Sequence, residues 1–83
     1  MDWILEYKMT EKENSQQKIE HTILEFIKNR TKQEESTASR HIHRRFDMPI
    51  EEIEKILSNL ENKQIIKKFY DEEYQEYRFK FIN

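Results

Sequence analysis

The sequence predicts an α+β domain in which three helices pack against a C-terminal two-stranded hairpin. Apolar residues recur at helical spacing in three separate segments, and the C-terminal segment changes to the alternating pattern of strands. The single proline, Pro49, separates the second segment from the third. Eighty-three residues allow one domain with a modest core, and five Phe, four Tyr and one Trp argue against a disordered chain.

The first helix is predicted to begin at a cap near Thr10 or Ser15 and to end near Asn29 or Arg30. Thr10 and Glu13 have the spacing of a capping box, and Ser15 is a second candidate cap. One face of this helix is apolar and is formed by Ile19, Ile23, Phe26 and Ile27.

The first nine residues fit neither a helix nor a strand. Five apolar residues are mixed there with Asp2, Glu6 and Lys8, namely Trp3, Ile4, Leu5, Tyr7 and Met9. A terminus this apolar either frays or packs against the domain or a second copy. We therefore divide the chain into an N-terminal segment, residues 1–14, that is flexible or dimerising, and a domain at residues 15–83.

Two shorter helices follow. Residues 36–39 form a short extended piece that leads into a helix cap, and Ala38, Ile42 and Phe46 make one apolar stripe on the second helix. Residues 47–49 end that helix and start the third, because proline is favoured in a first turn. The third helix runs to about Asn62, and its apolar face is Ile53, Ile56, Leu57 and Leu60.

The C-terminal segment is predicted to be a hairpin with one buried face. Residues 64–70 are rich in Ile and aromatics, residues 71–73 form a polar turn, and residues 74–82 alternate. Two strands alone are marginal in water, so we expect the hairpin to lie across the helices. Its two faces in the last strand are Tyr77, Phe79 and Phe81 on one side and Arg78 and Lys80 on the other.

This order of elements resembles the winged helix-turn-helix superfamily over roughly residues 15–82. Residues 23–27, 37–38, 49–53 and 57–60 are similar to the apolar scaffold of Z-DNA-binding (Zα-type) domains. The contact residues of that family are absent, since Glu54 and Ser58 stand where it has an Asn and a Tyr. The wing also lacks the proline-rich stretch and the Trp of that family. The resemblance implies the fold and not Z-DNA binding.

Duplex DNA is the usual partner of a winged helix, with the third helix in the major groove and the wing on the backbone. We therefore predict a small winged-helix DNA-binding protein that regulates transcription. Arg40, Arg44 and Arg45 crowd the second helix, where His41 and His43 can add charge near neutral pH. The DNA contacts are predicted to be Arg40, Arg44, Arg45, Lys55, Asn59, Lys67 and Lys68.

The alternative is a winged helix that binds a protein and no DNA. Glu51 and Glu54 on the third helix and the acidic turn at residues 71–73 would repel phosphates and attract a basic partner. Aromatic residues of the wing exceed what one face of a small domain buries, so the surplus would form an apolar patch. Together with Trp3 and Tyr7, this patch predicts a homodimer whose interface uses the N-terminal segment.

Several classes of function are excluded or disfavoured. A chain without glycine carries neither a Walker loop nor a dinucleotide fingerprint, and the absence of cysteine removes thiolate nucleophiles and cysteine-ligated zinc. His41 and His43 are two residues apart and point in different directions on a helix. We therefore expect no catalytic site, no metal and no cofactor. Without an apolar run long enough for a bilayer, we expect a soluble, cytoplasmic protein with no membrane partner.

Overall fold

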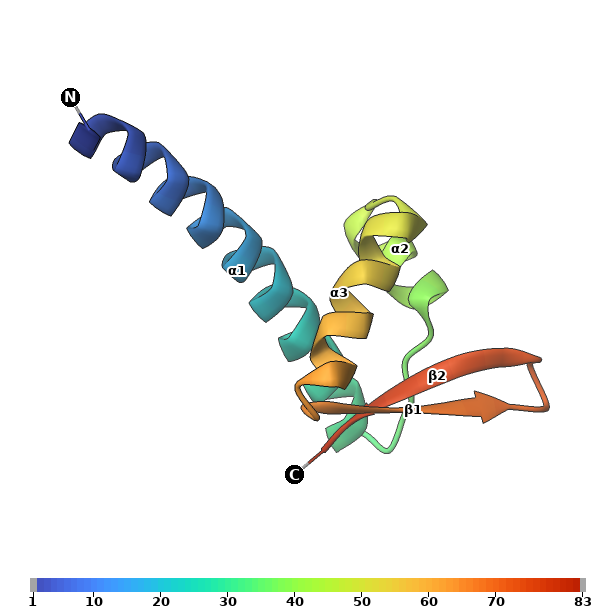
Figure 1. Ribbon diagram of the computed structural model, residues 1–83. Helices are drawn as coiled ribbons and strands as arrows, with labels where there is room; N and C mark the ends of the chain where they lie inside the picture. Colours follow the sequence, from blue (N-terminus) through green and yellow to red (C-terminus); the bar gives the residue numbers. More distant parts are fainter. Residues whose placement is uncertain (1, 83) are drawn as a thin grey trace.

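The computed structural model describes the backbone of residues 2–82 and the side chains of residues 17–82. Three helices, α1 (Asp2–Lys32), α2 (Ser39–Phe46) and α3 (Ile50–Asn62), precede an antiparallel hairpin of β1 (Ile66–Asp71) and β2 (Glu76–Phe81) (Figure 1). This is the α+β layout of a winged-helix core with a β-wing. The fold class predicted from the sequence is confirmed.

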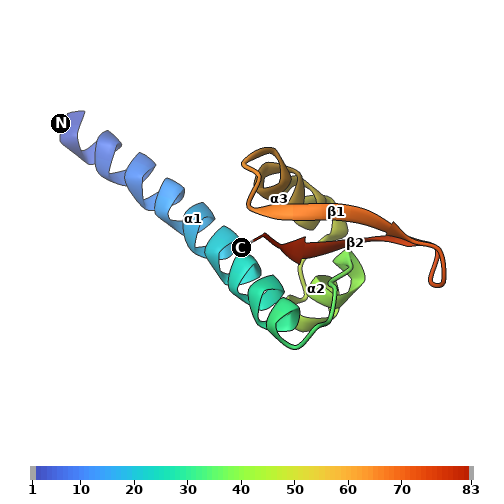
Figure 2. The ribbon, with the colours of Figure 1, turned by 90° about the horizontal axis from the view of Figure 1, so that it is seen from below.

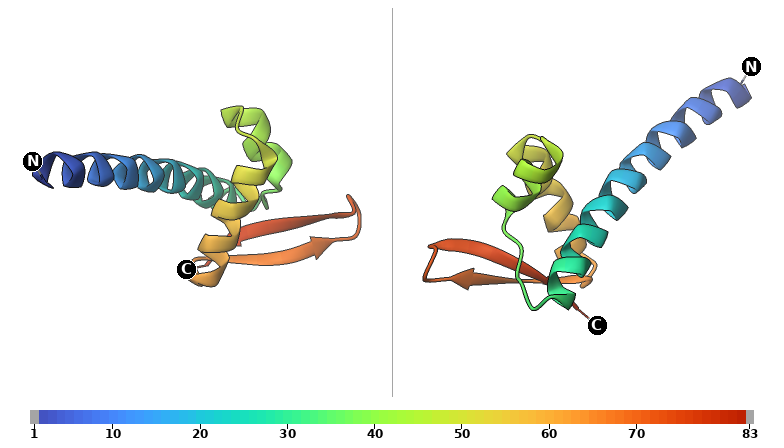
Figure 3. Two further views of the ribbon diagram at one scale, coloured as in Figure 1. Left: turned by 45° about the horizontal axis from the view of Figure 1, so that its top comes forward. Right: turned by 180° about the vertical axis from the view of Figure 1, so that it is seen from behind.

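Helix α1 is longer than predicted at both ends. It begins at Asp2 instead of near Thr10 or Ser15, and it ends at Lys32. Residues 2–14 contain no glycine or proline to interrupt a helix, and most of them are good helix formers, which explains why the helix continues through the expected caps. Its N-terminal half extends away from the other elements (Figure 3). The predicted apolar patch at Trp3 and Tyr7 lies outside the described side chains.

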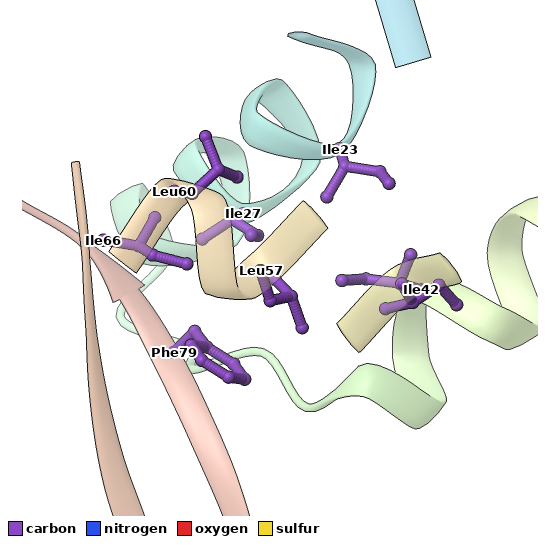
Figure 4. Packing of buried hydrophobic residues seen from close by; sticks show 8 residues of the cluster. Ile23, Ile27, Ile42, Leu57, Leu60, Ile66 and Phe79 are labelled. Atoms are coloured by element: carbon purple, nitrogen blue, oxygen red, sulfur yellow. The ribbon is translucent and has the colours of Figure 1, made fainter. Parts of the chain in front are cut away.

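The core lies where the C-terminal half of α1 meets α2, α3 and the base of the hairpin. Its side chains are at most 3% exposed and converge on one interior (Figure 4). Fully burying a residue of this kind stabilises the fold by about 1.5–3 kcal/mol. All of these residues belong to predicted apolar faces except Ile66, which lies in the Ile-rich strand: Ile23, Ile27, Ile42, Ile53, Leu57, Leu60, Ile66 and Phe79.

Each connection between elements contains one non-glycine residue in the left-handed region. Their φ angles lie between 54° and 61°. Asp47 forms the C-cap of α2 in this way, and its N–H donates to the His43 carbonyl at 2.8 Å. Pro49 follows as the N-cap of α3, so residues 47–49 separate the two helices as predicted. The four left-handed residues of the described chain are Glu34, Asp47, Gln64 and Gln75.

The hairpin is only partly covered by the helices. In its register Ile66 pairs with Phe81 and Tyr70 pairs with Tyr77. Phe79 is buried, but Tyr77 on the same face is 55% exposed. The prediction of one continuous buried face is therefore wrong for the distal half, because that half extends beyond α2 and α3 (Figure 2).

Thr37 connects the wing to the helices. Its backbone exchanges two hydrogen bonds with Phe79, at 3.0 and 2.8 Å. The extended piece predicted at residues 36–39 is confirmed for Thr37 and Ala38, whereas Ser39 already belongs to α2. The Thr37 side chain is fully buried and accepts a hydrogen bond from Arg30 Nε at 3.1 Å. Arg30 Nη2 also donates to the Ser36 carbonyl at 2.8 Å. Helix α1, the linker and β2 are thereby fixed to one another.

Replacing Thr37 by Val should lower the free energy of unfolding by about 1–3 kcal/mol, because Arg30 Nε loses its acceptor in a part-buried site. Urea denaturation measures the change. Thr22→Val is the matched control, since the exposed Thr22 hydroxyl donates to the Lys18 carbonyl and to no other group of the described residues, and it should change stability by less than about 0.5 kcal/mol. Equal losses in the two variants would contradict this role of Thr37.

Candidate nucleic-acid interface

The seven predicted DNA contacts are all exposed, but they do not form one continuous surface. Arg40 lies in the first turn of α2, whereas Arg44 and Arg45 lie in its last turn. Lys55 and Asn59 line a second hollow together with Ile19 of α1, and Lys55 lies where this side of α3 meets its outward face. Lys67 and Lys68 are consecutive residues of β1, and they therefore point to opposite faces of the hairpin.

Two pairs of the seven predicted contacts each share a hollow: Lys55 and Asn59 line one beside α1, and Arg40 and Lys68 line another. Arg40 and Lys68 line a shallow depression between the start of α2, the middle of α3 and the wing. Glu54 lines the same hollow, so a carboxylate of α3 lies near both cations. The other lining residues are Ala38, Ser39, Glu76, Tyr77 and Phe79.

A carboxylate of the wing already engages the arginines next to this hollow. Arg40 Nε donates to Glu76 Oε1 at 2.7 Å, and Arg78 donates to Glu76 Oε2 at 3.0 Å. Arg78 also contacts Asp71 at 3.4 Å. The hydrogen bond from Arg40 is the main cause that holds the pKa of Glu76 below its usual value, against the opposing effect of burial. Much of the positive charge in this region is therefore neutralised within the protein.

Three tyrosines project from the distal half of the wing. Tyr70, Tyr74 and Tyr77 are each at least half exposed, and the rings of Tyr70 and Tyr77 meet edge to face at 5.1 Å. Lys68 Nζ lies 4.4 Å from the centroid of the Tyr77 ring, and the Arg78 guanidinium lies 4.6 Å from that of Tyr74. The predicted surplus of wing aromatics is confirmed. These residues are exposed because the distal half of the hairpin extends beyond α2 and α3, which the sequence does not reveal.

His41 is bound into the start of α2 as a neutral imidazole. Its Nδ1 accepts a hydrogen bond from the Ala38 backbone N–H at 2.9 Å, so the ring proton is on Nε2. Burial is the main cause that lowers the pKa of His41 from its usual value. The expectation that His41 adds positive charge near neutral pH is therefore wrong.

The charged groups that act on His41 have both signs. Three arginines from α1, α2 and β2 lower the pKa further, and one carboxylate opposes them. These groups are Arg30, Arg40, Arg78 and Glu76. Protonation of His41 would thus remove a helix cap and add a cation beside three others.

Among residues 17–82, whose side chains are described, no three His, Cys, Asp or Glu residues come together in a group that could hold a metal ion. His43 Nδ1 lies 2.6 Å from the Met48 carbonyl, which indicates that this nitrogen carries a proton.

No helix in the described part of the chain has the length and apolar character needed to cross a bilayer.

Comparisons of the chain with protein-family models, curated proteins and solved structures found no match. The assignment to the winged-helix architecture therefore depends on the order and arrangement of the elements.

The stability of the protein should fall as the pH decreases through and below about 6.5, the usual value for histidine. The pKa of His41 is lowered in the folded state, so the unfolded chain binds the proton more readily there and stability is lost as pH falls. Denaturant unfolding between pH 7.5 and 5 measures this slope.

His41→Gln keeps a hydrogen-bond acceptor near the Ala38 N–H but does not titrate, so its stability should depend less steeply on pH. Asn29→Gln, at an exposed position of α1, changes no titratable group and is the control that should keep the slope of the unmodified protein. An unchanged slope in the His41 variant would show that the cap does not couple folding to pH.

Proposed function

We propose that the protein is a small winged-helix DNA-binding protein that regulates transcription. One observation carries the proposal: the start of α2, the middle of α3 and the wing converge on a hollow where Arg40, Lys68 and Tyr77 lie together. These are the elements with which winged helices approach duplex DNA, with the third helix in the major groove and the wing on the backbone. A cytoplasmic location goes with this proposal.

Helix α3 would supply the groove contacts. Residues spaced at i, i+4, i+7 and i+11 share one outward face. On α3 this face carries three side chains that can donate hydrogen bonds to bases or phosphates, and one carboxylate. The four exposed residues are Lys55, Ser58, Asn62 and Glu51.

The wing would supply the backbone contacts. Lys68 makes no ion pair within the described part of the chain, and its ammonium group lies over the exposed Tyr77 ring. Tyrosine hydroxyls and lysine ammonium groups are both common phosphate ligands. The distal half of the hairpin extends beyond the helices (Figure 2), as a wing that follows the DNA backbone requires.

Carboxylates on the same surface limit the affinity. Glu54 lines the hollow, Glu51 lies on the outward face of α3, and Glu76 neutralises Arg40. Phosphate contacts dominate DNA affinity, so we expect weak binding that depends strongly on salt.

A second candidate function is the capture of a basic protein partner, by the same surface and without DNA. Two observations favour it: the carboxylates of Glu51 and Glu54 make no ion pair among the described residues, and Glu72 and Glu73 are exposed at the tip of the wing.

The DNA proposal is tested by titrating a fluorescent mixed-sequence duplex with the protein at low and near-physiological salt, with anisotropy as the readout. Arg40→Ala and Lys68→Ala should each weaken binding and reduce the salt slope by about one, the effect of one lost phosphate contact. Lys18→Ala, on the exposed side of α1, should leave both values unchanged. Absence of binding even at low salt would overturn the proposal.

The pair Glu51→Gln and Glu54→Gln separates the two candidate functions. If α3 faces DNA, the double variant should bind duplex more tightly, because two carboxylates no longer repel phosphates. If the surface holds a basic protein instead, the same variant should lose the partner that the unmodified protein captures. A variant with unchanged duplex affinity would contradict the placement of α3 against DNA.

A further inference from the structure

The two edges of the hairpin differ in how their backbone groups are used. On the β2 edge, Phe79 exchanges two hydrogen bonds with Thr37, and the Phe81 N–H donates to Thr31 Oγ1 at 3.0 Å. Because Phe79 points its backbone groups away from β1, its partner Lys68 points its own N–H and C=O to the outer edge of β1. By the alternation of a strand, Tyr70 does the same. Among the described residues no hydrogen bond reaches these outer groups.

The side chains along this open edge match a second copy of the same strand in antiparallel orientation. If Phe69 lies opposite Phe69 of the second copy, Lys67 of each copy faces Asp71 of the other, so this pair occurs twice. Lys68 then faces Tyr70 on the other side of the sheet. Opposite charges and cation–aromatic pairs directly across two strands stabilise the pairing.

Charge selects this register among those that the backbone permits. A shift that places Lys68 opposite Lys68 of the second copy would oppose two like charges and remove the contact between Lys67 and Asp71. Edge lysines commonly prevent unwanted pairing of strands, and they do so unless an acid lies across from them. The register centred on Phe69 supplies that acid and pairs residues 67–71 with the same residues of the second copy.

We propose that β1 pairs with β1 of a second copy to form a dimer with a continuous four-stranded sheet. The two-fold axis of such a pair is perpendicular to the sheet, so both helical bodies lie on the same face. That face carries Tyr70 and Tyr77, each at least half exposed in the single chain, and the second copy's helices lie beside them. The dimer is tested without DNA, and it involves Lys68 and the tyrosine face that the proposed DNA binding also uses. It leaves the β2 edge as it is.

The test is sedimentation equilibrium of the protein without DNA over a wide range of concentration. Lys68→Pro removes the outward N–H and adds bulk at the edge, but it costs the hairpin none of its own hydrogen bonds. We expect this variant to be a monomer at concentrations where the unmodified protein is a dimer. Lys68→Ala keeps the outward N–H but loses the contact with Tyr70 of the second copy, so it should weaken the dimer without abolishing it. Circular dichroism and the urea midpoint confirm that each variant is folded.

A charge reversal provides a matched pair of variants. Lys67 and Lys80 lie directly across the hairpin from each other on one face, but only Lys67 faces Asp71 of the second copy. Lys67→Glu should weaken the dimer by about tenfold, because it opposes two pairs of carboxylates. Lys80→Glu should leave the dissociation constant nearly unchanged. In either variant the new Glu faces the remaining Lys within the hairpin, which favours the fold.

Two results would overturn the proposal. The first is a protein that stays monomeric at every concentration. The second is a dimer that survives Lys68→Pro, which would place the interface elsewhere, with the N-terminal half of α1 as the next surface to test. A dimer that is lost with Lys68→Pro and weakened by Lys67→Glu but not by Lys80→Glu would support it.

Discussion

The relative positions of α1, the linker and β2 depend on the contacts that Thr37 makes with Arg30 and Phe79. The Thr37 backbone forms the rung against Phe79, while its buried hydroxyl is held by Arg30 of α1. One residue thus fixes the first helix, the linker and the second strand together. Helix α2 starts directly after this rung, so the position of Arg40 beside the wing follows from it. The meeting of α2, α3 and the wing is therefore a consequence of the linker as much as of the apolar core.

Part of the charge on the α3–wing surface is paired within the chain. Glu76 binds both Arg40 and Arg78, and Asp71 binds Arg78 again. Such pairs are worth little to stability where they are exposed, so their main effect is on what the surface can attract. Lys68, Glu51 and Glu54, in contrast, make no ion pair among the described residues, so they are the charged groups of this surface that are left to act on a partner.

The sequence predicted the fold well where one periodic face was buried and poorly where no packing partner decided the outcome. The faces of all three helices follow from spacing, and so does the break at residues 47–49. The early start of α1 was not predicted from the sequence. Thr10 and Ser15 were expected to cap the helix, but the helix propensity of the preceding residues extends it to Asp2. Among the predicted contacts, Arg40 and Lys68 do share a hollow, but Glu76 lies 36 residues from Arg40. No local pattern reveals a pairing over that distance.

The four left-handed residues have a consequence for the unfolded chain as well as the folded one. Glycine adopts a positive φ angle at the lowest cost, but this sequence has no glycine. Each non-glycine residue in the left-handed conformation costs on the order of 1 kcal/mol. In return, the unfolded chain has fewer accessible conformations and loses less entropy on folding. Local strain in the native state is thus exchanged for a stiffer denatured state. This trade helps a domain with a small core to remain folded in a chain that has no cysteine for disulfides.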